Sequence, residues 1–227
     1  MAPGDKPPLS WEASSVVQRF YNRAASGYDA MESFMQKIAF RSWRSLLWSN
    51  VRGPAVLEVG AGTGANFRHY PEGLRVVAVD LSPNMLRRAR VKATRGSVNV
   101  DLILMDAQSL ALRESVFDCV VTSFVFCSVP DPLLGLAELR RVCKTGASIF
   151  MLEHVRSANR VIGRVMDLMN PVAVRIGGEN INRNTVDNVA CSGLLLDKVT
   201  DLWGGVFKLI QATKGQAPPL EQQEVRL

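Results

Sequence analysis

The sequence predicts an α/β domain built on one mostly parallel sheet, with helices on both faces and an antiparallel edge. From Ala55 onward, short apolar runs alternate with stretches of helical periodicity, which is the pattern of a parallel sheet covered on both faces. A turn with three glycines directly follows the first apolar run. Two late apolar runs could supply two more strands that form the antiparallel edge, giving seven strands in all.

Hydrophobic periodicity and helix start and stop signals predict the individual elements. The predicted strands of the main sheet are Ala55–Val59, Arg75–Val79, Val100–Leu104, Phe117–Ser123 and Ala147–Glu153. The predicted helices are Ala65–His69, Pro83–Thr94, Pro132–Cys143 and Ala158–Asn170. The two late strands are expected around Leu194–Thr200 and Val206–Ala212.

The N-terminal region differs in character from the alternating pattern. A helix predicted over Met31–Trp48 is unusually apolar, with Lys37, Arg41 and Arg44 clustered in one narrow stripe. Residues 1 to about 10 and the tail from Lys214 are rich in proline or polar residues, so neither is expected to carry the fold. We therefore expect an N-terminal helical lid or interfacial extension over residues 1–50, a main domain over 51–214 and a tail over 215–227.

Length and composition are typical of a globular protein. The 227 residues are 47% apolar and 21% charged, which suits one decorated domain and excludes disorder as the main state. No uninterrupted apolar run of about 18 residues occurs, and the first residues lack the apolar stretch of a secretory signal. We therefore expect a cytoplasmic protein that associates with membranes only peripherally.

The basic residues are mostly arginines. The formal net charge is +6, with 20 Arg and 7 Lys among the 27 basic residues, and arginine favours planar recognition of phosphate or carboxylate. Charge alone leaves nucleic acid, an anionic membrane and an acidic small substrate open. No aromatic and basic platform of a nucleic-acid-binding module occurs, so nucleic acid is not expected. The four cysteines, too far apart for a metal clip, are interpreted as reduced core residues: Cys119, Cys127, Cys143 and Cys191.

The glycine-rich turn predicts a ligand site. Missing side chains let the backbone approach a ligand closely, and the following helix would offer free N–H groups to a carboxylate or phosphate. The turn satisfies two patterns at once. Gly60, Gly62 and Ala65 fit the dinucleotide pattern G-x-G-x-x-G/A, whereas Glu58, Gly60, Gly62 and Gly64 fit the E/D-x-G-x-G-x-G turn of methyltransferases that use S-adenosylmethionine.

Acidic residues at the strand ends separate the two patterns. Asp80 ends the second apolar strand, where a carboxylate can accept both ribose hydroxyl protons, as either pattern requires. Asp106 and Ala107 follow the third strand, and an acid there suits the exocyclic amine of adenine. Glu58, just before the glycines, suits an aminoacyl ammonium that no dinucleotide carries.

From about Val16 to Ala212 the order of motifs resembles that of class I S-adenosylmethionine-dependent methyltransferases, which have a Rossmann-like fold. The resemblance implies S-adenosylmethionine as cofactor, S-adenosylhomocysteine as product and no metal. A non-catalytic binding module and an NAD-dependent oxidoreductase are the competing interpretations. The implied cofactor-binding residues are Tyr21, Glu58, Gly60, Gly62, Gly64, Asn66, Asp80, Leu81, Met85, Asp106, Ala107, Ser123, Phe124 and Cys127.

Further motifs concern the methyl acceptor. The segment that contains Tyr21, Ala25, Tyr28 and Asp29 resembles the Y-x-x-x-A-x-x-Y-D segment of the ubiquinone/menaquinone methyltransferase branch. The stretches 153–156, 167–171 and 180–185 look closest to bacterial phospholipid N-methyltransferases of that branch and to their membrane-associated thiol-methylating relatives. The resemblance implies methylation of a phosphatidylethanolamine-type amine, with C-methylation of a quinone precursor or S-methylation of a small thiol as alternatives.

Chemistry and charge suggest roles for a few more residues. An ethanolamine ammonium must lose its proton before attack, so Tyr28 and His154 are the predicted positioning or proton-accepting groups. Arg160, Asn182 and Arg183 are predicted to bind a lipid phosphate. The Met31–Trp48 helix is predicted to lie on an anionic membrane surface, or else to pack across the sheet.

Overall fold

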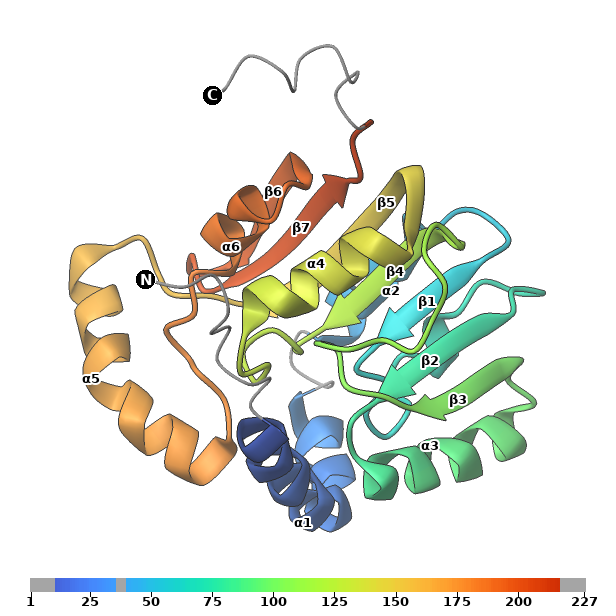
Figure 1. The fold of residues 1–227 in the computed structure, drawn as a ribbon. Coiled ribbons are helices and arrows are strands. Elements are labelled where there is room, and N and C mark those ends of the chain that lie inside the picture. Colours follow the sequence, from blue (N-terminus) through green and yellow to red (C-terminus); the bar gives the residue numbers. More distant parts are fainter. Residues whose placement is uncertain (1–10, 36–39, 217–227) are drawn as a thin grey trace, which may run out of the picture.

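A seven-stranded sheet forms the centre of the molecule (Figure 1). The computed structural model describes residues 11–35 and 40–216, with side chains described for 12–27 and 40–216. The strand order is β3-β2-β1-β4-β5-β7-β6. The strands are β1 (Val56–Val59), β2 (Val76–Asp80), β3 (Val100–Leu104), β4 (Phe117–Ser123), β5 (Cys143–His154), β6 (Leu195–Trp203) and β7 (Phe207–Thr213).

The sheet is parallel from β3 to β5 and antiparallel at the far edge. All pairs among β1 to β5 are parallel, while β7 runs antiparallel to both β5 and β6. The predicted mostly parallel sheet with an antiparallel edge is thereby confirmed. Because β1 has β2 on one side and β4 on the other, the order of the strands reverses at β1, and a crevice at such a reversal is where open α/β sheets bind ligands.

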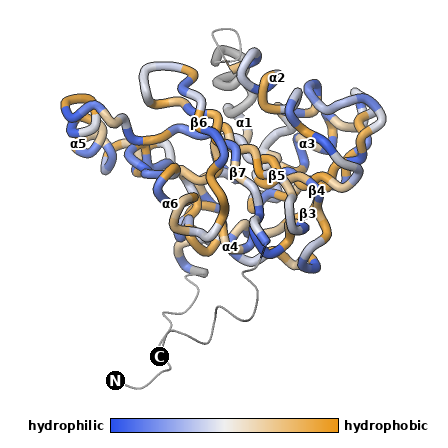
Figure 2. The backbone as a smooth tube through the Cα atoms, turned by 90° about the horizontal axis from the view of Figure 1, so that it is seen from above, coloured by the Kyte–Doolittle hydropathy of each residue, from blue (hydrophilic) through white to orange (hydrophobic). Residues whose placement is uncertain are grey.

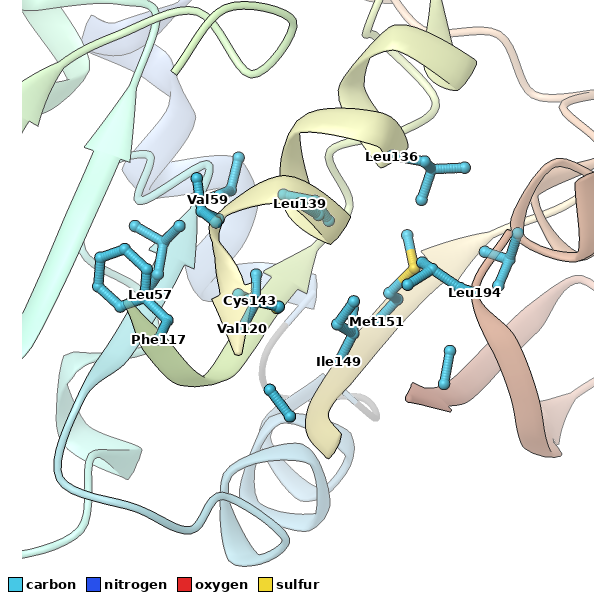
Figure 3. Close-up of a cluster of buried hydrophobic side chains, with 14 of the residues drawn as sticks. Leu57, Val59, Phe117, Val120, Leu136, Leu139, Cys143, Ile149, Met151 and Leu194 are labelled. Carbon is cyan, nitrogen blue, oxygen red and sulfur yellow. The ribbon is translucent and has the colours of Figure 1, made fainter. Parts of the chain in front are cut away.

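Helices cover both faces of the sheet, as predicted. They are α1 (Trp11–Met35), α2 (Arg41–Ser49), α3 (Pro83–Gly96), α4 (Pro132–Val142), α5 (Arg160–Gly177) and α6 (Thr185–Cys191), with a short 3-10 helix η2 (Phe67–His69). On one face, Leu136 and Leu139 of α4 pack on the buried strand residues Leu57, Val120 and Ile149 (Figure 3). On the other face, α2 and α3 pack through Leu47, Trp48 and Leu86.

Local sequence explains where the helices begin. The side chain of Ser82 accepts the backbone N–H of Met85, and a proline follows it at the first position of α3. Asp131 caps α4 in the same way and is also followed by proline. Asn159 accepts the N–H groups of Val161 and Ile162 at the start of α5. Each cap satisfies N–H groups that have no partner inside the helix.

The structure corrects the expectations for two helices. The predicted helix Ala65–His69 is only the three-residue η2. The predicted end at Asn170 is wrong, because α5 runs seven residues further, through Pro171, to Gly177. Proline removes one N–H donor from the helix, which the helix tolerates here on a largely exposed surface. Residues 180–185 lead into α6, a helix that the periodicity did not reveal.

The Met31–Trp48 prediction is only partly covered by the described residues. Residues 31–35 end α1 and residues 41–48 belong to α2, whereas residues 36–39, with Lys37, lie outside the described part of the chain. The predicted basic stripe is wrong at Arg44, whose side chain is buried. Among the cysteines, Cys191 is exposed, in contrast to the prediction that all four belong to the core.

The antiparallel edge is irregular. The pairing of β6 with β7 shifts register between Leu196 and Lys198 and again between Asp201 and Trp203. β6 is the last strand of the sheet, and within residues 11–35 and 40–216 no strand pairs with its other side. The exposed side chains of β6 include both aspartates and lysine.

Candidate functional site

A cavity of about 700 Å³, including its open mouth, lies at the carboxyl ends of β1, β2 and β4. Residues Val17 and Tyr21 of α1 form part of the wall. Ten of the predicted cofactor residues line the cavity, namely Tyr21, Gly60, Gly62, Asp80, Leu81, Met85, Asp106, Ala107, Ser123 and Phe124. The other four lie outside its wall, namely Glu58, Gly64, Asn66 and Cys127.

The glycine turn is shaped so that only backbone faces the cavity. Gly60, Gly62 and Gly64 all have positive φ angles, a conformation that costs a non-glycine residue energy. A Cβ atom on Gly60 would lie 2.2 Å from Cγ2 of Val125. The turn is held by Val79, whose carbonyl accepts the N–H of Gly60 at 2.8 Å. The bare backbone therefore leaves room for a ligand to approach closely.

The carboxylate of Asp80 is held at the end of β2 by backbone donors. The N–H of Gly62 donates to its Oδ2 at 2.8 Å, and the N–H of Ser82 donates to its Oδ1 at 2.8 Å. Burial raises the pKa of Asp80, while these N–H groups lower it. A carboxylate held in this way can accept the two hydroxyl protons of a ribose. The predicted contact of Asp80 with a ribose stays a prediction.

Asp106 connects the cavity wall to α1. The hydroxyl of Ser14 donates to Oδ2 of Asp106 at 2.6 Å, and the backbone N–H of Gln108 donates to Oδ1 at 2.9 Å. The side chain of Gln108 also donates to the hydroxyl of Ser14, at 2.9 Å. The acid expected to face the adenine amine is therefore also one of the points where α1 is attached to the sheet.

α1 is attached to the cavity rim at further points. Gln18 donates to the carbonyl of Leu81 at 2.9 Å. Asn22 accepts from the hydroxyl of Ser82 at 2.6 Å, and its carbonyl accepts from Asn84 at 2.9 Å. These contacts lie within two turns of Tyr21, which lines the cavity. They attach α1 to the rim of the cavity, and the lid role expected for the N-terminal extension stays a prediction.

Glu58 lies behind the glycine turn in a buried polar network. Its carboxylate accepts hydrogen bonds from the side chains of Asn66 and Tyr70. Arg44 donates to Oδ1 of Asn66 at 2.7 Å, and Asn66 also donates to the hydroxyl of Ser123 at 2.9 Å. Burial raises the pKa of Glu58 to about 7. Asn66 connects Glu58 to Ser123 in the cavity wall. The predicted contact of Glu58 with an aminoacyl ammonium stays a prediction.

Phe124 follows β4 with a φ of 57°, which is unfavourable for a residue with a bulky side chain. Its ring stacks on Phe40 at 4.9 Å between centroids, and the guanidinium of Arg44 lies 5.3 Å from the ring centroid. Such backbone strain is concentrated at functional sites. The aromatic packing around Phe124 therefore holds a strained residue in the cavity wall.

His154 lies next to this aromatic cluster and not in the cavity wall. Its ring packs edge-on against Phe207, with centroids 5.0 Å apart. Burial lowers the pKa of His154, so the imidazole is neutral at pH 7. The side chain of Tyr28 lies outside the described residues. The catalytic roles proposed for His154 and Tyr28 from the sequence stay predictions.

A polar cluster that sequence reasoning missed borders the cavity beside Tyr21. The Tyr21 hydroxyl lies 2.9 Å from the hydroxyl of Ser128 and donates to Oε1 of Glu179 at 3.2 Å. Burial raises the pKa of the Glu179 carboxyl group. Glu179 immediately precedes the 180–185 motif, but only the fold brings it within reach of α1.

The predicted phosphate-binding residues lie apart from one another. Arg160 is exposed at the first position of α5. Asn182 donates to Asp167 at 3.1 Å. Arg183 donates to the carbonyl of Val129, a cavity-lining residue, at 2.9 Å, and its Nε is buried without a hydrogen-bond partner among the described residues. Of the three, only Arg183 borders the cavity wall.

Within residues 11–35 and 40–216, no three His, Cys, Asp or Glu side chains gather as they would around a metal ion. None of the helices described there is long and apolar enough to cross a membrane.

Comparisons with known proteins find similarity to methyltransferases. Residues 57–151 match a family model described as a methyltransferase domain. A phosphatidylethanolamine N-methyltransferase of Cereibacter sphaeroides is 37% identical over 141 residues, which cover 61% of this chain and 68% of that protein. The ubiquinone/menaquinone biosynthesis C-methyltransferase UbiE of Hahella chejuensis is 26% identical over 184 residues, which cover 77% of this chain and 74% of that protein.

The fold is likewise shared with solved structures. A SAM-dependent methyltransferase of Thermotoga maritima superimposes with a TM-score of 0.67, at 19% identity, over 86% of this chain and 99% of that chain. Together, the methyltransferase-domain match, the relatives and the sheet order identify S-adenosylmethionine as the cofactor. The chain belongs to the class I S-adenosylmethionine-dependent methyltransferases.

Proposed function

We propose that this methyltransferase methylates the amine of phosphatidylethanolamine-type phospholipids. The proposal is supported by the similarity to a phosphatidylethanolamine N-methyltransferase, and it is carried by one observation in the structure. The Tyr21 hydroxyl, in the cavity wall, donates to the largely buried carboxyl group of Glu179. A carboxylate behind the wall attracts a cationic ammonium and disfavours an anionic acceptor.

The charge of Glu179 discriminates among the acceptors that the relatives suggest. A phenolate of a quinone precursor and a thiolate are anions when they react, so a nearby carboxylate would oppose their ionisation. An ethanolamine ammonium, in contrast, gains a counter-charge before it loses its proton. The cluster of Tyr21, Ser128 and Glu179 therefore favours an amine acceptor.

The same cluster provides a route for the proton. The ammonium gives its proton to the oxygen of Tyr21 while the Tyr21 hydroxyl proton passes to Glu179, along the hydrogen bond that already exists. Burial raises the pKa of Glu179, which makes it a better proton acceptor than an ordinary carboxylate. The amine is then neutral and has a lone pair with which to attack.

The remaining task of the protein is alignment. The bound cofactor supplies an electrophilic methyl group, so the enzyme must direct the amine lone pair in line with the bond to be broken and exclude water. Phe124, held in its strained conformation, and α1, attached through Ser14 and Gln18, provide an apolar wall and a cover.

Arg183 is the proposed partner of the lipid phosphate. Its guanidinium contacts the carbonyl of Val129 in the cavity wall, and its Nε is a buried donor without a partner among the described residues. Desolvation lowers the pKa of Arg183, so an added anion would relieve the cost of burying this charge. Asn182 and Arg160, also predicted from the sequence to bind phosphate, lie apart from Arg183 and are not part of this proposed contact.

The decisive experiment is an acceptor screen. Purified protein is incubated with methyl-labelled S-adenosylmethionine and a total lipid extract, and the labelled products are identified by mass spectrometry. We expect label in mono- and further methylated phosphatidylethanolamine. Label in a quinone but not in phospholipid, or label only in an added small thiol, would refute the proposed acceptor.

A further inference from the structure

Helix α5 stands at the outer end of the molecule with little cover. In Figure 1 it lies at the side of the sheet, beyond α6, and in the view from above it is again at the periphery (Figure 2). Of its 18 residues, only Gly163 and Met166 are buried. A helix that buries so little of itself against its own domain has a free face.

That free face is apolar. Leu168 is 79% exposed, Ile176 74% and Val161 72%. Exposed apolar residues recur at helical spacing along the whole of α5, and they form a stripe that we call the α5 stripe: Val161, Ile162, Val165, Leu168, Met169, Val172 and Ile176. Contiguous exposed apolar surface of this kind marks an interaction site.

Arginines form one border of the α5 stripe. On the helical wheel Arg175 and Arg164 follow Leu168, and Arg160 comes next after Pro171; all three arginines are exposed. The acidic residue of the helix, Asp167, projects from the other side of these arginines and pairs with Arg156 at 2.8 Å. The stripe is thus bordered by positive charge with no acid along that border.

We propose that α5 lies in the headgroup layer of an anionic bilayer, with the α5 stripe in the acyl region and the arginines on lipid phosphates. An amphipathic helix with a basic border binds in this way, because apolar burial and attraction to anionic lipids add together. The surface differs from the Met31–Trp48 segment on which the sequence led us to expect membrane contact.

The size of the stripe favours a membrane over a second copy of the chain. An 18-residue helix is about 27 Å long and about 10 Å wide, so its face offers on the order of 300 Å². A stable protein interface buries about 800 Å² on each partner. A bilayer needs no such area, because each inserted side chain contributes separately.

Docking through α5 would also orient the active site. The helix ends at Gly177, and two residues later Glu179 accepts the hydrogen bond from Tyr21 in the cavity wall. The end of α5 therefore lies beside the cavity, so that a bilayer along the helix would pass close to the site. This consequence accords with a lipid acceptor, but the docking itself does not depend on the acceptor.

The test measures binding to vesicles of phosphatidylcholine and phosphatidylglycerol in equal amounts, with no ethanolamine lipid and no methyl donor, so it is independent of the reaction. The variant L168D/I176D places two charges in the α5 stripe. The matched control V91D/L133D makes the same change of charge at two exposed apolar positions on α3 and α4. Both should bind S-adenosylhomocysteine like the parent, which shows that they are folded.

We expect the parent and V91D/L133D to co-sediment with the vesicles and L168D/I176D to bind at least tenfold more weakly. Equal binding by both variants, or no binding by the parent, would overturn the proposal. Sedimentation equilibrium without lipid tests whether a second copy of the chain covers the α5 stripe instead. A parent dimer that L168D/I176D disrupts, without a difference in vesicle binding, would identify a second copy as the occupant and refute the membrane.

Discussion

The hydroxyl of Ser14 donates a 2.6 Å hydrogen bond to Asp106, which joins the first helix to the wall of the cofactor cavity. We expect Ser14→Ala to loosen α1 and to weaken S-adenosylhomocysteine binding about fivefold, because one hydrogen bond to a charged acceptor contributes about 1 kcal/mol or more. Calorimetry measures the effect. Ser15→Ala is the control, since its hydroxyl donates only to Glu12 within the same helix. If the two substitutions change the affinity equally, the hydrogen bond between Ser14 and Asp106 does not contribute to cofactor binding.

The glycine turn can be tested by adding a single methyl group. Gly60→Ala should lower the melting temperature by several degrees and abolish cofactor binding, because its Cβ would meet Val125 at 2.2 Å. Gly73→Ala is the control, because Gly73 also has a positive φ but a Cβ atom there would have no atom within 4 Å. Its cost should be limited to backbone strain of about 1 to 2 kcal/mol, with binding unchanged. If the protein tolerates Gly60→Ala, the tight contact between Gly60 and Val125 is contradicted.

Glu58 should make the stability of the protein depend on pH. Burial raises its pKa from 4.5 to about 7, so the folded state binds more protons than the unfolded state between these values. The free energy of unfolding should therefore decrease as the pH rises from about 4.5 to about 7, by on the order of 3 kcal/mol for this group. Glu58→Gln should flatten that part of the pH profile in urea unfolding. An unchanged slope would show that Glu58 is not the responsible group.

The proton route through Tyr21 predicts a loss of turnover. Tyr21→Phe and Glu179→Gln should each reduce kcat by about 100-fold or more, the typical contribution of a proton acceptor, with little change in affinity for S-adenosylhomocysteine. In Glu179→Gln, part of the activity should return at higher pH, where more of the amine is already neutral. Ser128→Ala keeps the Tyr21–Glu179 bond and should lose much less. A similar loss in all three variants, without pH rescue, would indicate a structural role.

Loss of Arg183 should weaken the binding of the lipid and leave the binding of the cofactor unchanged. We expect Arg183→Ala to raise the KM for phosphatidylethanolamine at least tenfold, because charge-assisted hydrogen bonds contribute about 1.5 to 3 kcal/mol. Affinity for S-adenosylhomocysteine should stay unchanged. The exposed Arg140 of α4 provides the control, since Arg140→Ala removes the same charge far from Val129. Loss of cofactor affinity in Arg183→Ala would contradict a role restricted to phosphate.

Sequence periodicity was sufficient to predict the strands of the sheet. The predicted bounds of the third and fourth strands agree with β3 and β4 to the residue. The positive φ angles of Gly60, Gly62 and Gly64 agree with the tight turn that their spacing predicts. Such features are local, and local sequence determines them.

Other parts of the site depend on contacts between distant segments. Glu179 and Tyr21 are 158 residues apart, and no pattern in the sequence links them. Glu58 is surrounded by Asn66, Tyr70 and Arg44, so its burial could not be read from its place before the glycines. The sequence placed the expected membrane contact on Met31–Trp48, and only the packing of the described residues shows that the apolar face of α5 stays uncovered.

The irregular pairing of β6 has a consequence for solubility. An outer strand presents unpaired backbone groups on which the strand of another molecule can add, and this is how sheet proteins begin to aggregate. The register shifts at 196–198 and 201–203 distort that edge, and Asp197, Lys198 and Asp201 would have to be brought against a neighbouring chain. The last strand of the sheet therefore resists extension by a second molecule.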